Sequence, residues 1–208
     1  MADELVLYSN PMSRGRMARW MLEEVSQPYR VEMVEYGPPM KSASYLAVNP
    51  MGKVPALKHG EVVVTECGAI IAYLADAFPT AGLAPPVTSS LRAPYYRWLM
   101  FAAGPIEASA SNKALGVVIP EDKRGMVGYG SSELVQGALE KLFDANKYVL
   151  GDTFSAADVY VGGELGWMLQ FGMFEKRPSL VRYVADVSGR AAFKRAAALD
   201  DALIPKKA

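Results

Sequence analysis

Two short segments of the chain have the composition of a peptide-binding site. Residues 49–57 read Asn-Pro-Met-Gly-Lys-Val-Pro-Ala-Leu, and residues 65–70 read Thr-Glu-Cys-Gly-Ala-Ile. A Val-Pro step that leads into a short apolar strand can expose a backbone edge, and such an edge can pair with an extended peptide. Glu66 opens an apolar helical pattern, so a carboxylate and unpaired N–H groups would lie beside that edge. The two segments predict a receptor for a small peptide-like ligand with an α-amino-acid end.

Composition limits the partners that such a protein can have. The 208 residues allow one large domain or two small ones. Hydrophobic residues make up 51% and charged residues 21%, a globular balance that can bury a sizeable core. The formal net charge of +0 gives no long-range attraction to nucleic acid or to an anionic membrane. We therefore expect neither partner, and we interpret Lys206-Lys207 as a solvated tail.

The single cysteine, Cys67, bears on compartment and on metal binding. It excludes an internal disulfide and is typical of a reducing compartment. One cysteine and one histidine argue against a structural zinc site, so no metal is expected. The acidic start at residues 1–4 does not look like a signal peptide, and no apolar run approaches the ~18 residues of a membrane span. We expect a cytoplasmic protein.

The first 79 residues alternate between strand and helix patterns. Tyr29, Val31 and Met33 alternate with charged residues, which indicates a half-buried strand. Met17, Trp20 and later apolar residues recur at helical spacing after Ser13, a natural N-cap. This alternation predicts a small α/β layer. Strands are expected at 5–8, 29–33, 54–58 and 61–64, and helices after Ser13, at 42–47 and at 70–78.

Strand patterns fade in the second half. Residues 80–88 contain Gly82, Pro85 and Pro86 and form the predicted linker. Beyond it we expect an all-α domain over 89–208 and a Gly-rich loop over 116–130. Ser155 and Asp158 have the spacing of a capping box, for which the simplest role is stability. The predicted helices span 91–103, 131–142, 156–171 and 179–189.

With these motifs, the chain resembles a cytosolic glutathione S-transferase of the bacterial, serine-dependent type. The resemblance is carried by the strand end at 7–9 with Ser13, by 49–57, by Glu66 with Ala69-Ile70, and by 154–158. It implies a thioredoxin-like N-terminal domain that binds glutathione, a helical C-terminal domain that shapes the second-substrate site, and a homodimer. It also implies that Pro55 is cis, which would turn the N–H and C=O of Val54 toward the cysteinyl backbone of glutathione.

Under this resemblance, Ser13 is the candidate that stabilises the glutathione thiolate. A residue at a helix N-terminus lies in a positive field, and a hydroxyl there can donate to a sulfur anion. Ser9 and Asn10 are alternates, because in some classes of the family the active hydroxyl lies just before the proline of this loop. Tyr8 is a weaker alternative and more typical of a core residue at a strand end.

The two ends of glutathione need their own partners. Glu66 would pair with the γ-glutamyl ammonium, and the N–H groups of Cys67 and Gly68 would hold the adjacent carboxylate. The family usually has serine where this chain has Cys67, so a strong O–H donor is replaced by a weak S–H donor. Lys53 and Lys41 are the cations expected near the glycine carboxylate.

The leading prediction is an enzyme that adds glutathione to an electrophilic, apolar small molecule, or displaces a leaving group from it, in detoxification. A non-catalytic binding or dimerisation module is the alternative that Cys67 favours, and a glutathione-dependent isomerase or peroxidase is a further one. The second-substrate pocket is expected to include Met12, Tyr96, Phe101, Glu107 and Trp167.

Overall fold

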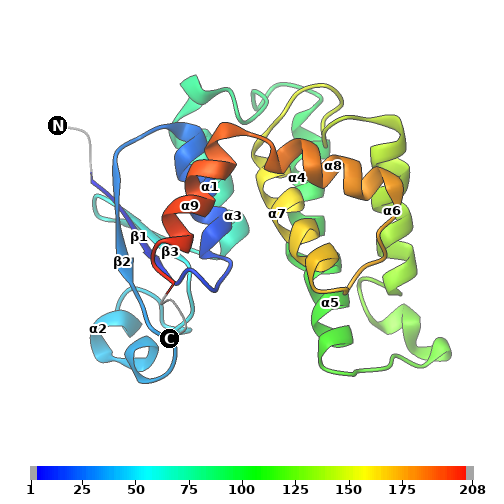
Figure 1. Cartoon of the computed structure of the whole chain (residues 1–208), viewed down its shortest axis with the longest axis horizontal. Helices are drawn as coiled ribbons and strands as arrows, with labels where there is room; N and C mark the ends of the chain where they lie inside the picture. The colour runs from blue at the N-terminus through cyan, green and yellow to red at the C-terminus, as the bar shows by residue number, and fades with distance from the viewer. Residues whose placement is uncertain (1–3, 205–208) are drawn as a thin grey trace. The chain divides into compact units, whose positions relative to one another are not determined.

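The computed structural model describes residues 4–204, so Lys206 and Lys207 and the start of the chain lie outside the described residues. The described chain divides into two compact units. Residues 4–81 with 190–204 form the first unit, and residues 82–189 form the second. Figure 1 follows the chain through both units. No helix among residues 4–204 is long and apolar enough to cross a membrane.

A mixed four-stranded sheet lies in the first unit, in the order β2-β1-β3-β4. Strand β1 pairs in parallel with β2 and antiparallel with β3, and β4 pairs antiparallel with β3. The parallel pair needs a crossover, which helix α1 supplies. This arrangement confirms the predicted α/β layer. The strands are β1 (Leu5–Ser9), β2 (Tyr29–Met33), β3 (Ala56–His59) and β4 (Val62–Thr65).

Two helices provide most of the apolar cover in this unit. Trp20 and Met21 of α1, and Ile70 and Leu74 of α3, are all at most 2% exposed. Each large side chain buried in this way contributes about 1.5–3 kcal/mol relative to exposure. The helical segments of this unit, apart from α9, are α1 (Gly15–Val25), α2 (Ala43–Leu46), α3 (Cys67–Ala77) and the 3₁₀ turns η1 (Pro38–Lys41) and η2 (Pro79–Ala81).

The last helix, α9 (Ala191–Asp201), packs on α1 within the first unit, and Figure 1 shows the two side by side. The Trp20 and Phe193 rings meet edge to face at 5.0 Å. Arg190 donates to Glu24 at 2.7 Å. We expected 89–208 to form one helical domain, and the structure differs at α9, because these contacts attach the helix to the α/β unit. The limits 1–79, 80–88 and 89–208 otherwise remain a proposal.

The second unit is helical throughout its regular structure. Helix α4 ends at Phe101, close to the expected residue 103. The chain nevertheless remains helical beyond it, because Pro105 is accommodated in a wide π-helical turn, η3, that leads directly into α5. Phe143 and Tyr183 stack at 3.6 Å in the core of this unit. Its elements are α4 (Arg92–Phe101), η3 (Ala102–Ile106), α5 (Glu107–Ala114), η4 (Glu121–Met126), α6 (Ser132–Ala145), α7 (Ala156–Gln170) and α8 (Pro178–Ser188).

The predicted capping box at the start of α7 is confirmed. The Asp158 carboxylate accepts from the N–H of Ser155 at 2.9 Å and from the N–H of Val149 at 2.8 Å. The Tyr183 hydroxyl donates to the same carboxylate at 3.1 Å. One carboxylate thus ties the helix start, the preceding turn and α8 together, which a surface cap would not do.

A buried ion pair joins α1 to α9. Asp200 is 1% exposed and Arg19 is 3% exposed, and their charged groups lie 3.2 Å apart. Neither carboxylate oxygen of Asp200 has a hydrogen-bond partner among the described residues. Burial raises the pKa of Asp200 to about 6, against the lowering effect of Arg19 and Arg16. The carboxylate therefore lies where its ionised form is unfavourable.

We predict that stability rises as the pH falls from 7 to about 5. The folded Asp200 takes up a proton near pH 6 whereas the unfolded chain does so near 3.8, so the folded state binds more protons in this window. In Asp200→Asn, the change in the free energy of unfolding between pH 7 and about 5 should be smaller by roughly 1–2 kcal/mol, as measured by urea unfolding. Asp201→Asn, on the exposed neighbour, should keep the slope. Equal slopes for the wild type and Asp200→Asn would contradict the prediction.

Candidate active site

The strand register brings three segments of the first unit to one end of the sheet. Tyr8 lies opposite Ala56, and Ala56 lies opposite Thr65. Ser9 ends β1, Pro55 precedes β3 and Glu66 follows β4, so the three residues lie together at this end of the sheet, which we call the shared edge. Helices α1 and α3 both begin there, since each follows its strand at this edge. Two helix N-termini at one edge create a positive field suited to an anion.

A sulfur contact places the two helix starts next to each other. The Cys67 thiol at the start of α3 donates to the carbonyl of Arg14 at 3.5 Å, just ahead of α1. Cys67 is 7% exposed. The residue therefore serves as a small packing group between the helices. Its thiol is not directed freely into solvent.

Ser13 lies at the start of α1, although the helix itself begins at Gly15 and Arg14 is its N-cap. The Ser13 hydroxyl donates to the carbonyl of Asn10 at 2.6 Å and accepts from the N–H of Gly15 at 3.0 Å. It is 7% exposed. It thus satisfies one N–H of the first turn, as a cap would. To donate to a thiolate, the hydroxyl must turn away from Asn10.

The alternates to Ser13 have different surroundings. Ser9 is 1% exposed, and its hydroxyl has no hydrogen-bond partner among residues 4–204. A Cβ on Gly15 would come within 1.9 Å of that oxygen, so Ser9 is wedged under the start of α1. The Asn10 amide donates to the Val34 carbonyl at 3.1 Å and accepts from the Met12 N–H at 3.0 Å. Both ends of the Asn10 side chain therefore brace the loop.

The backbone rim, by which we mean residues 53–55 just before β3, has the cis proline that the resemblance implies. The Val54–Pro55 peptide bond is cis. Tyr45 and Asn49 both donate to the carbonyl of Lys53, at 2.6 and 2.8 Å. Burial raises the pKa of Tyr45 to about 12, so its hydroxyl remains a donor at neutral pH. These bonds fix the chain just ahead of Val54, which is half-buried.

One lysine is held against this rim. The Lys41 ammonium donates to the carbonyls of Met51 and Gly52, at 2.9 and 3.3 Å. Gly52 has a φ of 58°, and a Cβ there would lie 2.7 Å from the Lys41 Nζ and 2.6 Å from the Met40 carbonyl. Only glycine combines this positive φ with such a close approach of the Lys41 side chain and the Met40 carbonyl. Lys53, by contrast, is exposed on the same loop.

Glu66 has an uncommon backbone conformation. Its φ of 66° and ψ of 122° are rarely adopted by a residue with a side chain, and they cost on the order of 1–3 kcal/mol. Such outliers concentrate at ligand sites. Glu66 is exposed, and Cys67 and Gly68 behind it are buried. No sequence pattern could have revealed this conformation.

The residues expected to line a second-substrate pocket are distributed over both units. Met12 is 67% exposed in the first unit. Tyr96 is 45% exposed on α4, under the Arg92 guanidinium, and Phe101 packs edge to face on Trp98 at 5.0 Å. Glu107, at the start of α5, and Trp167 on α7 are half-buried in the second unit. That these five residues line one pocket stays a prediction.

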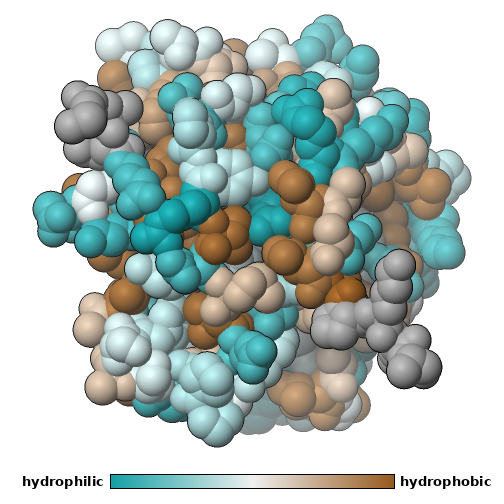
Figure 2. Space-filling view, turned by 60° about the vertical axis from the view of Figure 1, so that its left-hand side comes forward, coloured by the Kyte–Doolittle hydropathy of each residue, from teal (hydrophilic) through white to brown (hydrophobic). Residues whose placement is uncertain are grey.

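The described residues contain no group of histidine, cysteine and acidic side chains that could hold a metal ion. The face in Figure 2 mixes apolar and hydrophilic side chains. Exposed apolar residues of the first unit include Met12, Met33, Tyr36 and Met51. The Tyr36 hydroxyl donates to the Met12 carbonyl at 3.0 Å, which ties the loop after β2 to the start of α1.

The family described as glutathione S-transferase, N-terminal domain, matches residues 12–77. A sphingomonad glutathione S-transferase solved with glutathione has a TM-score of 0.75 and 26% identity to this chain, and the match covers 94% of this chain and 98% of that one. Residues 12–77 belong to the glutathione S-transferase N-terminal domain family, and the chain as a whole is similar to glutathione S-transferases. The matched segment contains the rim, the start of α1 and Glu66.

Curated members of the glutathione S-transferase family extend the likeness. Glutathione S-transferase GST-4.5 of Xanthomonas campestris is 27% identical over 172 residues, which are 80% of this chain and 84% of that protein. Human glutathione S-transferase theta-2B is 27% identical over 153 residues. That match covers 69% of this chain and 63% of the human protein, so the chain spans less than two thirds of that relative.

We predict that Gly52→Ala destabilises this protein more than Gly82→Ala. Both glycines have positive φ, 58° and 67°, which costs an alanine about 1–2 kcal/mol. A Cβ at Gly82 meets nothing within 4 Å, whereas one at Gly52 overlaps Lys41 and a carbonyl. We expect an additional loss of about 1–3 kcal/mol for Gly52→Ala in urea unfolding. Equal losses would show that the approach of Lys41 to the rim is unimportant.

Proposed function

We propose that this glutathione S-transferase activates glutathione as a thiolate and transfers its sulfur to an electrophilic, apolar small molecule. The observation that carries the proposal is the shared edge of Ser9, Pro55 and Glu66, where a backbone rim meets two helix starts. A tripeptide with an anionic sulfur complements this edge in both shape and charge. The sphingomonad relative, solved with glutathione, supports this choice of ligand.

Glutathione would bind as an added strand. The N–H and C=O of Val54 pair with its cysteinyl backbone. Glu66 pairs with the γ-glutamyl ammonium, and the N–H groups of Cys67 and Gly68 donate to the neighbouring carboxylate. Lys41 and Lys53 bracket the glycine carboxylate. Each of these contacts remains a proposal. Together they would hold the thiol in one position relative to α1.

Thiolate formation is the step that requires the helix start. A free thiol titrates near 8.5, and each unit of lowering needs about 1.4 kcal/mol. One charge-assisted hydrogen bond from Ser13 and the field of α1 together supply roughly 2–3 kcal/mol. Most of the bound thiol would then be ionised at pH 7. The Ser13 hydroxyl would exchange the carbonyl of Asn10 for the sulfur anion.

The sulfur lone pair then attacks the electrophilic carbon. In a displacement, the leaving group departs with its bonding electrons. In an addition, the product anion takes a proton from solvent, so no oxidant or reductant is consumed. Proximity and the preformed thiolate would account for most of the rate. Met12, Tyr96, Phe101, Glu107 and Trp167 form the proposed surroundings of the electrophile, and a cytoplasmic homodimer that acts in detoxification completes the proposal.

Ser13→Ala should lower turnover with a generic electrophile by roughly 10- to 1000-fold, because one anion-stabilising donor is lost. The same variant should shift the pH–rate profile to higher pH while the far-UV circular dichroism spectrum stays unchanged. Ser9→Ala is the matched control, since its hydroxyl is buried against Gly15. Loss of turnover in Ser9→Ala with normal activity in Ser13→Ala would show that the role belongs to Ser9 instead.

Cys67→Ser should keep or tighten glutathione binding by up to about 10-fold, measured by calorimetry. Serine replaces a weak S–H donor by a strong O–H donor at the α3 start. Cys67→Ala controls for the loss of the thiol alone and should leave the affinity within a few-fold of the wild type. A large loss in both variants would reveal a role for the thiol that the proposal lacks.

A non-catalytic binding module is the second candidate function, and Cys67 in the place of serine is the observation that favours it. The two functions differ in turnover. The proposed enzyme binds glutathione and conjugates it to at least one member of a broad electrophile panel. Retention on immobilised glutathione with no conjugation across that panel would favour the module.

A further inference from the structure

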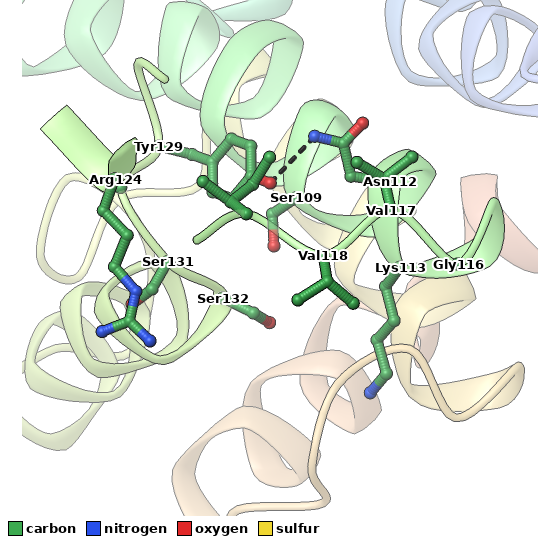
Figure 3. Close-up of a pocket in the computed structure, with 12 residues that line it drawn as sticks. Ser109, Asn112, Lys113, Gly116, Val117, Val118, Arg124, Tyr129, Ser131 and Ser132 are labelled. Atoms are coloured by element: carbon green, nitrogen blue, oxygen red, sulfur yellow. Dashed lines mark hydrogen bonds between the residues drawn. The ribbon is translucent and has the colours of Figure 1, made fainter. Parts of the chain in front are cut away.

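A cavity of about 310 Å³ lies within the second unit, between the end of α5, the loop after it and the start of α6. Figure 3 shows the side chains that line it. Ser109, Asn112 and Lys113 recur at i, i+3 and i+4 along α5 and therefore line one wall. Tyr129 and Ser132 lie on the opposite wall. The proposed glutathione chemistry uses none of these residues.

The charged side chains that line the cavity are all basic. Lys113 and Arg124 line it, and no aspartate or glutamate is among the lining residues. The Lys113 ammonium is fixed by the carbonyls of Gly172 and Met173, at 3.3 and 2.8 Å, which leave its charge unneutralised. Arg124 has Glu121 at 3.7 Å, but that acid is largely exposed. The lining therefore favours an anion.

The cavity also contains donors suited to oxygen atoms. Ser109 is 2% exposed, and its hydroxyl has no hydrogen-bond partner among the described residues. A buried hydroxyl without a partner is costly, so a ligand that accepts from it gains the full bond. The Tyr129 hydroxyl accepts from the Asn112 amide at 2.8 Å and keeps its own proton to donate. Figure 3 shows the hydroxyls of Ser109 and Ser132 directed into the space between the walls.

Helix α6 adds a positive field to these donors. The helix has 14 residues and begins at the cavity, with Ser131 as its N-cap. The Ser131 hydroxyl accepts from the Leu134 N–H at 3.2 Å, so the helix start is well ordered by its own cap. Helix starts favour phosphate and sulfate groups. Two basic side chains, the unpartnered Ser109 hydroxyl and a helix start thus line one cavity.

We propose that this cavity binds the tetrahedral oxyanion of a small phosphate or sulfate monoester. Lys113 and Arg124 supply charge, and Ser109 and Tyr129 donate to the oxyanion oxygens. Val117 and Val118, which line the outer side, contact a short hydrocarbon portion of the ester. The site is separate from the proposed glutathione chemistry, because none of its lining residues takes part in that chemistry.

Calorimetry on the full chain tests the site with methyl phosphate and methyl sulfate as probes, at constant ionic strength in chloride. We expect one site with a millimolar dissociation constant for at least one probe. Stronger binding of methyl phosphate above pH ~6, where it becomes a dianion, identifies the phosphate ester as the ligand class. Tighter binding of methyl sulfate than of methyl phosphate on both sides of pH ~6 identifies the sulfate ester as the ligand class. Saturating glutathione should leave either affinity unchanged.

Variants distinguish binding in the cavity from nonspecific electrostatic attraction of the anion to the surface. Arg124→Gln should weaken binding by about 5- to 20-fold, the scale of one charge-assisted hydrogen bond. Lys123→Gln removes the same charge from the same exposed turn without lining the cavity, and it should change the affinity by less than about 2-fold. Ser109→Ala should weaken binding about 5-fold with no loss of thermal stability.

Three results would overturn the proposal. They are no saturable heat with either probe at tens of millimolar, equal weakening by Arg124→Gln and Lys123→Gln, and displacement of the bound ester by glutathione. The last would locate the ester at the glutathione site. Glutathione affinity reports on residues of the first unit alone, so the two proposals fail separately.

Discussion

The pairing of β3 between β1 and β4 is the constraint on which the candidate active site depends. Because Tyr8, Ala56 and Thr65 are in register, the chain leaves β1 and β4 and enters β3 at the same end of the sheet. Helices α1 and α3 must then begin at that edge, and their N–H groups face the same space. A slip of one residue in β3 would move Pro55 and would turn Leu57 away from the core. The chemistry proposed for the site therefore rests on apolar packing in the sheet.

Helix α9 extends that constraint to the other side of α1. Its aromatic contact with Trp20, and the ion pairs of Arg190 and Arg195 with Glu24 and Glu23, hold helix α1, which begins just after Ser13. The Arg190–Glu24 pair is partly buried and bidentate, whereas the Arg195–Glu23 pair is more exposed and contributes little by itself. The buried pair of Arg19 and Asp200 differs, because removing one partner leaves an unpaired charge in the core. The end of the chain thus supports the geometry of its beginning.

Local patterns were sufficient to predict the strands and the capping box at Ser155, because each depends on residues that are near in sequence. The cis bond at Pro55 followed from the family resemblance. The packing of α9 on α1 could not be predicted, since it depends on partners more than 160 residues apart. The same holds for the Ser13 hydroxyl, which donates to Asn10, and for the backbone of Glu66, because neither leaves a signal in residue type. The π-helical turn that carries the chain through Pro105 into α5 was also not predicted.

The ionisation of glutathione bound to the wild-type protein tests the central claim most directly. The thiolate absorbs in the ultraviolet where the thiol does not, so a difference titration of the complex against pH gives the thiol pKa. The account predicts a midpoint below about 7, lowered from ~8.5 by the start of α1 and one donated hydrogen bond. A midpoint near 8.5 for the saturated complex, or no complex at millimolar glutathione, would contradict it.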